Sequence, residues 1–408
     1  MKSAHPHSIC LHFQTEDLYF SFVDDPALFR QHLLSQHSLH PELFPSSFSQ
    51  GFLLHDLRWS TKQQLSLRRI KLKATGDCYL VRPSFLMPYM VARTDVVEKA
   101  LYLRHWGVSF DALAYVFGKD PSFWYRVCSA QGRPSLVGTT VKSPDKLPSH
   151  LVSDEKHTWL KGVPVYVATT AASGCLLGAA VSLSTSAPEL ETSYKEFAQE
   201  ALDLHPTYQP KTVCTDGWSA TQAAWRRLFP RVCLILCYLL SVLKIEEFCV
   251  RDLELRRLLV EKAWYAYAAV NQSQFSQRLR RFREWATAQL KTGVVKEKVL
   301  SLCRKAPLFA RAYRNEGAYR TSNEVDRLMN HQDRVLYAMR YFHGTPKSAR
   351  LAVRSMALMW NFHPYGARQR RQNPQRKSPF HDLNGFEYHS NWLHNLLIAS
   401  SLGGRRRT

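Results

Sequence analysis

The chain lacks the features that mark membrane proteins, secreted proteins and zinc fingers. Its nine cysteines form no Cys-x-x-Cys pair, which indicates reduced and mostly buried thiols. The longest apolar run, residues 232–243, is about half as long as a membrane span. No apolar stretch follows the first residues as it would in a signal peptide. These absences predict a cytoplasmic protein that does not enter a membrane.

Acidic residues are also scarce. The 408 residues include 33 Asp and Glu against 55 Lys and Arg, so the formal net charge is +22. A chain this basic is attracted to a polyanion, of which nucleic acid is the commonest. We predict double-stranded DNA as the partner and a nucleoid-associated location, and the alternative is a basic surface that is merely solvated.

Residues 1 to about 60 are rich in His, Ser and Pro, and we predict a small N-terminal module over residues 1–90 that is partly irregular. Within this module, residues 62–73 alternate basic and apolar side chains, which is typical of a strand with one basic face. Such a face could follow a phosphate backbone, and solvation alone would also explain it.

Residues 91–140 predict a helix-turn-helix region. Apolar residues share one face of a first helix, Ser109 caps a second, and Asp120-Pro121 opens a third. Two short helices that end at glycine, followed by a third that begins with proline, form the helix-turn-helix pattern. The alternative is a three-helix packing unit without DNA contact. The predicted contacts to DNA phosphates are Arg104, Lys119, Arg126 and Arg133.

From residue 148 to 246 the pattern is that of an α/β domain. Three β-prone runs, a helix, a short strand, a second helix and a last apolar run (232–240) follow in order. This β-β-β-α-β-α-β series is that of an RNase H-like catalytic domain with a mixed five-stranded sheet. In that fold the first strand is central and lies beside the strand that follows the first helix.

Three further segments complete the predicted organisation. Residues 247–318 carry only helical patterns and predict an all-helical insertion. Residues 319–365 predict the C-terminal helices of the catalytic domain. Residues 366–408 hold many arginines among Gln, Asn and Pro, which predicts a flexible basic tail.

A few acids stand at the ends of predicted strands or at a helix start: Asp154, Asp216, and Glu324 or Asp326. Hard Mg²⁺ ions prefer carboxylate oxygens, and two ions about 4 Å apart clamp both reacting oxygens in phosphoryl transfer. We therefore predict a site for two Mg²⁺ ions, with Mn²⁺ as a substitute. The alternatives are structural: Asp216 could cap the next helix, Asp154 could pair with Lys156, and the last acids could favour a helix N-terminus.

Four stretches surround these acids: residues 153–157, 213–230, 237–245 and 321–328, the last of them Thr-Ser-Asn-Glu-Val-Asp-Arg-Leu. Together they resemble prokaryotic insertion-sequence transposases of the DDE/D superfamily, on the side similar to Mutator-like elements, and the likeness extends from about residue 82 to the tail. The last stretch is similar to a Thr-Thr-Asn-x-(Ile/Val)-Glu-Arg-Leu signature whose final acid falls on Asp326. The resemblance implies Asp154, Asp216 and Asp326 as catalytic residues and metal ligands. It also implies DNA cleavage and strand transfer by protomers that assemble on DNA.

One position departs from the family pattern. Where the family often has Cys-Phe-Leu-His, this chain has Cys237-Tyr-Leu-Leu240. Three hypotheses therefore stand: a DNA transposase, a transposase-derived DNA-binding protein without catalysis, and an RNase H-like nuclease of repair or RNA turnover. The helix-turn-helix pattern and the helical insertion argue against the third.

Overall fold

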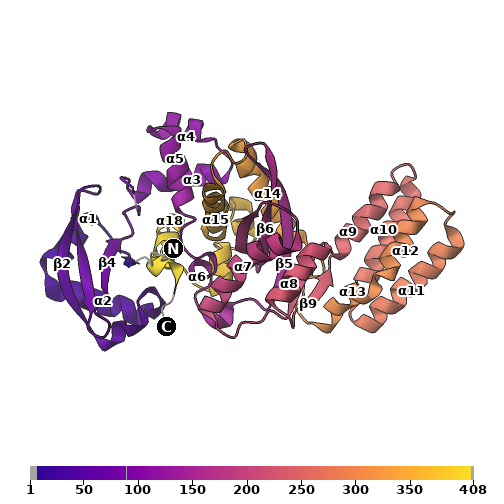
Figure 1. Ribbon diagram of the computed structural model, residues 1–408, viewed down its shortest axis with the longest axis horizontal. Coiled ribbons are helices and arrows are strands. Elements are labelled where there is room, and N and C mark those ends of the chain that lie inside the picture. The colour runs from indigo at the N-terminus through magenta and orange to yellow at the C-terminus, as the bar shows by residue number, and fades with distance from the viewer. Residues whose placement is uncertain (1–6, 89, 406–408) are drawn as a thin grey trace.

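The computed structural model describes residues 7–88 and 90–405 (Figure 1). Along the long axis lie an N-terminal lobe, a central lobe that holds a five-stranded sheet, and a block of helices at the far end. The two ends of the described chain meet between the first two lobes, where the Cys10 N–H donates to Ser401 Oγ at 3.0 Å. None of the described helices is long and apolar enough to cross a membrane.

The N-terminal lobe contains a four-stranded sheet with two helices, a regular part that the sequence did not predict, joined by less regular segments such as residues 40–51. Its sheet has the order β1-β4-β3-β2, with β1 parallel to β4 and the other pairs antiparallel. The predicted strand over residues 62–73 is confirmed as β3, whose Leu65, Leu67 and Ile70 are buried. Arg69 on its basic face is held by Asp56, with Nε 2.6 Å from Oδ1. The elements are β1 (Ser8–Leu11), α1 (Glu16–Asp24), α2 (Pro26–Leu39), β2 (Phe52–Ser60), β3 (Leu65–Leu72) and β4 (Cys78–Pro83).

Three short helices follow where the sequence predicted them, at the top of the central lobe in Figure 1. The predicted caps are present: Ser109 Oγ accepts the Ala112 N–H, and Asp120 Oδ1 accepts the Phe123 N–H. These helices are α3 (Thr94–His105), α4 (Phe110–Phe117) and α5 (Pro121–Ala130), and the shorter α6 (Leu136–Thr140) comes next.

The central sheet has the order β7-β6-β5-β8-β9, so the first strand is central and lies beside β8, as predicted. β5 is antiparallel to β6 and parallel to β8, which makes the sheet mixed. One face is covered by α7 and α8, and the other by α14 and α15. Successive strand residues point to opposite faces, so Asp154 and Glu155 of β5 face different layers of helices. The elements are β5 (His150–Leu160), β6 (Val163–Ala172), β7 (Cys175–Ser182), α7 (Ala187–Leu204), β8 (Thr212–Thr215), α8 (Ser219–Leu228), β9 (Cys233–Leu236), α14 (Asn323–Ala338) and α15 (Pro346–Phe362).

The block of helices between β9 and α14 confirms the predicted all-helical insertion. It has a core of its own, in which Phe275, Leu279 and Phe282 are buried. The apolar run at 232–240 is not one strand, because β9 ends at Leu236 and a helix begins at Tyr238. The helices are α9 (Tyr238–Phe248), α10 (Leu253–Tyr267), α11 (Gln272–Gln289), α12 (Val294–Arg304) and α13 (Ala306–Ala310).

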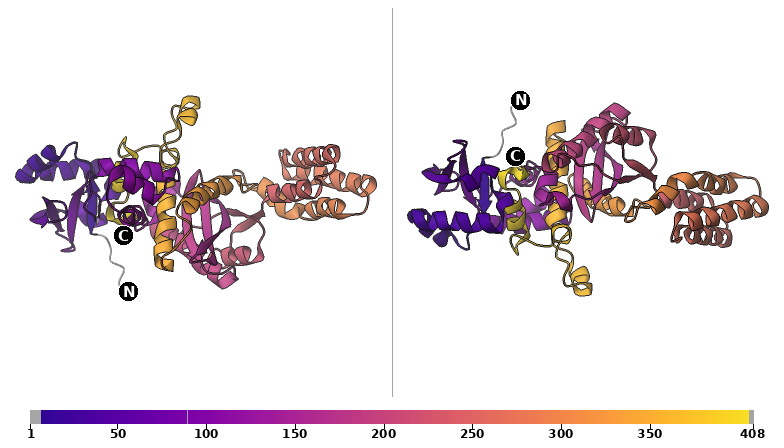
Figure 2. Two further views of the ribbon diagram at one scale, coloured as in Figure 1. Left: turned by 90° about the horizontal axis from the view of Figure 1, so that it is seen from above. Right: turned by 90° about the horizontal axis from the view of Figure 1, so that it is seen from below.

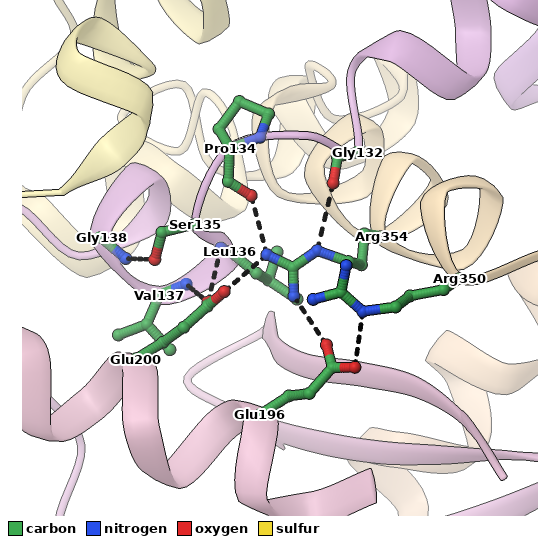
Figure 3. Close-up of polar contacts among 10 residues, drawn as sticks. All are labelled: Gly132, Pro134, Ser135, Leu136, Val137, Gly138, Glu196, Glu200, Arg350 and Arg354. Carbon is green, nitrogen blue, oxygen red and sulfur yellow. Dashed lines mark hydrogen bonds and ion pairs between the residues drawn. The ribbon is translucent and has the colours of Figure 1, made fainter. Parts of the chain in front are cut away.

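A buried ion-pair network ties α15 to α7 and to the chain that enters α6 (Figure 3). Arg354, 3% exposed, bonds Glu200 Oε1 at 2.6 Å and Glu196 Oε2 at 3.2 Å. Its other N–H groups donate to the carbonyls of Gly132 and Pro134. Because the buried guanidinium has a hydrogen-bond partner on each side, this network fixes the segment between α5 and α6 to α7 and α15.

The C-terminal segment is folded, so the prediction of a flexible tail over 366–408 is wrong for its described part. α18 (Trp392–Ala399) buries Leu393, Leu396 and Leu397 between the first two lobes. α17 (Pro379–Asn384) packs against α15. These apolar side chains form contacts with segments far away in sequence, which basic composition does not reveal.

One part of this segment does present its basic residues to solvent. Residues 366–377, here called the basic finger, carry the short helix α16 (Ala367–Gln372) and extend away from the body in Figure 2. Its base is fixed, because Tyr365 Oη and Arg376 Nε both donate to Asp382 Oδ2 at 2.7 Å. Its outer surface holds exposed Arg368, Arg370 and Arg371.

Candidate active site

The three predicted aspartates lie on neighbouring elements of the central lobe. Asp154 is in β5, Asp216 directly follows β8, and Asp326 is in the first turn of α14. β5 and β8 are hydrogen-bonded neighbours, and α14 packs on β5. The negative charges of both other aspartates act on Asp154, so the fold brings the three carboxylates together.

Asp154 is the most perturbed of the three. Its Oδ1 accepts the N–H of Glu155 at 2.8 Å, and its side chain is half-buried. Burial raises the pKa of Asp154 to about 7, and the charges of Asp216 and Asp326 act in the same direction. An ionised carboxylate in this position is therefore stabilised only when a cation joins it.

Lys156 is not that cation. Its Nζ lies 2.6 Å from Asp333 Oδ2, on the second half of α14. The alternative in which Asp154 pairs with Lys156 is therefore wrong.

Asp216 does not cap the helix that follows it. α8 begins at Ser219, its cap position is Trp218, and no side chain caps it. Asp216 Oδ1 instead accepts the N–H of Trp218 at 2.8 Å, which holds the carboxylate in a turn ahead of the helix. Gly217 makes this turn possible, because its φ is +96° and a Cβ would lie 2.3 Å from Leu236 Cδ1.

Asp326 is oriented by a residue that the sequence did not single out. Ser322, 1% exposed, donates from Oγ to Asp326 Oδ2 at 3.1 Å. Its own N–H donates to Cys237 Sγ at 3.2 Å, so the thiol after β9 anchors the start of α14. Burial raises the pKa of Asp326, against the hydrogen bond from Ser322. A signal was available in the Ser-x-x-x-Asp spacing, which places both side chains on one helix face.

Glu324, the other possible third acid, points elsewhere. Its Oε1 accepts the N–H of Gly174 in the β6–β7 turn, and its charge acts on the Tyr319 hydroxyl. Asp326 rather than Glu324 thus belongs with Asp154 and Asp216.

A second buried acid lies behind the site and was not predicted. Glu155, next to Asp154 but on the opposite face of the sheet, is 7% exposed. Its Oε1 accepts hydrogen bonds from the hydroxyls of Tyr194 and Thr221, both at 2.7 Å. Burial raises the pKa of Glu155. Strand alternation alone predicts that Glu155 faces the side of the sheet opposite to Asp154. Its hydroxyl partners could not be predicted, because the sequence does not show how α7 and α8 pack against β5.

The donor set fits hard cations. Oxygen atoms of carboxylates are the ligands that Mg²⁺ and Mn²⁺ take, and none of the three aspartates forms an ion pair with a described Lys or Arg. Among the described residues, three ligand atoms within 4.8 Å of one another occur only at His12, His389 and His394. The three aspartates do not form such a group in this structure, so their carboxylate oxygens are not all within 4.8 Å of one another.

The position that departs from the family pattern is apolar in space as well. Leu240 lies in the first turn of α9 and packs at the edge of the main apolar core.

Of the four predicted DNA contacts, the prediction for Arg104 is wrong. Arg104 is fully buried, donates to the carbonyls of Val108 and Val335 at 2.9 and 2.8 Å, and lies over the Phe110 ring. The helix face that carries it is covered by α14, so it stabilises the fold. Lys119, Arg126 and Arg133 are exposed, as a phosphate contact requires.

No protein-family model matches this chain, and no curated protein matches it. The functional conclusion therefore depends on the geometry of the acids and on the surfaces around them.

Proposed function

We propose that this protein is a DNA transposase with an RNase H-like catalytic domain, which cleaves element ends and joins them to target DNA with two Mg²⁺ ions. The observation that carries the proposal is the convergence of Asp154, Asp216 and Asp326 without a protein cation in a chain of net charge +22. The strand order, with the first strand central, supports the RNase H-like assignment.

The described contacts support metal binding by each acid. Asp154 is on the central strand β5, and the charges of Asp216 and Asp326 both act on it, so it would hold a cation together with either of them. Trp218 N–H holds Asp216 Oδ1, and Ser322 holds Asp326 Oδ2, which leaves the second oxygen of each for a cation. Bound Mg²⁺ would supply Lewis acidity at the phosphoryl oxygens and stabilise the charge that develops in the transition state.

Exposed cations on two other parts of the surface would hold the DNA. Lys119 and Arg126 lie on the α4–α5 unit, and the basic finger presents three exposed arginines on a fixed base. Side chains of this kind bind phosphates with little regard to sequence. Because two element ends must meet during transposition, the working complex on DNA is a homo-oligomer.

The test is strand cleavage by Asp216→Asn. We expect this variant to lose Mg²⁺-dependent cleavage of a duplex that carries the inverted repeats flanking the reading frame, and to keep DNA binding. Asn keeps the hydrogen bond from Trp218 and removes the charge, so the fold should persist. Asp333→Asn is the matched control, because Asp333 is an acid beside the site that pairs with Lys156. Cleavage at the wild-type rate by Asp216→Asn would refute the proposal.

The apolar surroundings of Leu240 favour a second candidate, a transposase-derived DNA-binding protein without catalysis. In that case the wild-type protein binds the same duplex and gives no product in either Mg²⁺ or Mn²⁺. Restoring the family's residue with Leu240→His would then be the variant to assay for recovered cleavage.

A further inference from the structure

A cleft of about 710 Å³ opens between the N-terminal lobe and the central lobe, away from the three aspartates. One wall comes from β1, β3 and β4, and the other from the end of α5, from α18 and from the last described residues. Gln63 closes one end, because its Nε2 donates to the carbonyls of Met87 and Met90. The volume of the cleft is within the range of small-ligand sites, about 300 to 1,000 Å³.

The charge of this cleft is of one sign. Lys62, Arg82, Arg133 and Arg405 line it, and none of the described lining residues carries a carboxylate. Arg82 is buried, whereas Lys62, Arg133 and Arg405 are exposed, and cations gathered around one cavity repel one another. An anion inside would relieve this repulsion.

Arg82 gives the sharpest indication. Arg82 is only 8% exposed, and among the described residues its side chain donates one hydrogen bond, from Nη1 to the carbonyl of Leu86. No carboxylate among the described residues pairs with it. Buried charges are normally paired, because an unpaired one has lost hydration without compensation. The remaining N–H groups of this guanidinium are suited to phosphate oxygens.

Part of the remaining lining is apolar, among polar residues such as Ser60, Gln131 and Ser400. Leu67, Leu80 and Met87 line the same space as the four cations. Phosphate alone would leave this surface uncovered, whereas a phosphate ester with a flat or apolar group would cover it. Methionine side chains adapt to such groups because they are flexible and polarisable.

We propose that this cleft binds a nucleotide unit, with its phosphate on Arg82 and the neighbouring cations and its base on the apolar wall. The unit comes either from a free nucleotide or from a single-stranded nucleic-acid end. This site is separate from the acids, so it stands whether or not the protein is a transposase.

The experiment uses the full-length protein in EDTA, which removes catalysis from the measurement. A fluorescent pentathymidylate is the probe, and AMP and inorganic phosphate are the competitors. We expect binding that Lys62→Gln/Arg133→Gln/Arg405→Gln weakens by about tenfold or more, because three phosphate-facing charges are removed. Arg251→Gln/Arg281→Gln/Lys291→Gln is the control, since it removes three exposed charges from the distant helical block. It should change the affinity by less than about twofold.

The competitors identify the source of the unit. Displacement by AMP supports a free-nucleotide site, and displacement only by unlabelled oligonucleotide supports a strand end. The proposal is overturned if the wild-type protein does not bind the pentathymidylate probe. It is also overturned if the cleft variant and the control variant lose affinity for the probe equally. Arg82→Gln provides a second variant, and its unfolding midpoint shows whether lost binding comes from lost structure.

Discussion

The raised pKa of Asp154 leads to a prediction about stability that requires no DNA substrate. Asp154→Asn should stabilise the metal-free protein at pH 8. Burial and two neighbouring carboxylates raise the Asp154 pKa from 3.8 to about 7. Each pKa unit corresponds to about 1.4 kcal/mol, so ionising this group in the folded protein costs up to about 4 kcal/mol. Since the side chain is only half-buried, we expect about 2 to 4 kcal/mol.

The sign of the pH dependence follows from proton binding. Between pH 4 and 7 the folded protein binds a proton at Asp154 that the unfolded chain has released, so stability falls as pH rises through this window. Above pH 7 both states are ionised and the full cost is present. Asparagine cannot ionise, and its Oδ1 can still accept the Glu155 N–H. The advantage of the variant should therefore be small near pH 4 and largest at pH 8.

The assay is the midpoint of urea unfolding in EDTA at pH 5 and pH 8. Asp24→Asn is the control, because Asp24 is exposed and remote from the site, and it should show no such dependence. Mg²⁺ at pH 8 should stabilise the wild-type protein and not Asp154→Asn. If the difference in unfolding midpoint between Asp154→Asn and the wild type is the same at pH 8 as at pH 5, the folded protein does not raise the pKa of Asp154 and the reasoning is refuted.

Two further predictions concern the scaffold and the DNA surface. Arg354→Met should lower the free energy of unfolding by about 3 to 5 kcal/mol, because it leaves Glu200 buried without its guanidinium partner. The control Arg350→Met, at the exposed end of the network, should lower it by less than about 1 kcal/mol. Equal unfolding midpoints for the two variants would contradict this. Replacing the three exposed arginines of the basic finger by Gln should weaken duplex binding and reduce the salt slope of log K by up to about 2.7. Fluorescence anisotropy between about 50 and 200 mM salt measures the slope, and an unchanged slope would exclude the finger from the DNA interface.

The positions of most strands and helices could be predicted because their signals are local. The alternation of β3, the Ser109 cap and the Asp120-Pro121 start each depend on a few neighbouring residues. The N-terminal sheet was missed because β1 pairs with β4, about seventy residues later, as Ser8 opposite Leu80 shows. The burial of α18 was missed for the same reason, since its partners come from the other end of the chain.

The site shows the same division. Strand ends and a helix start placed Asp154, Asp216 and an acid near 326 on one side of a sheet. The resemblance implied Asp326 rather than Glu324, and the direction of α14 gives a physical reason, because Glu324 reaches the β6–β7 turn. Arg104 was misassigned because a helix sequence does not say which face a distant helix will cover.

The distribution of charge couples the metal and DNA in the proposed reaction. Exposed cations lie on the α4–α5 unit and the basic finger, whereas none of the three aspartates forms an ion pair with a Lys or Arg in the described part of the chain. A phosphodiester held by those cations would meet three carboxylates and be repelled, at a cost that rises where water is excluded. Divalent ions reverse the sign of the charge at that point. DNA affinity of the wild-type protein should thus rise when Mg²⁺ is added, and for Asp216→Asn the metal-free affinity should exceed that of the wild type.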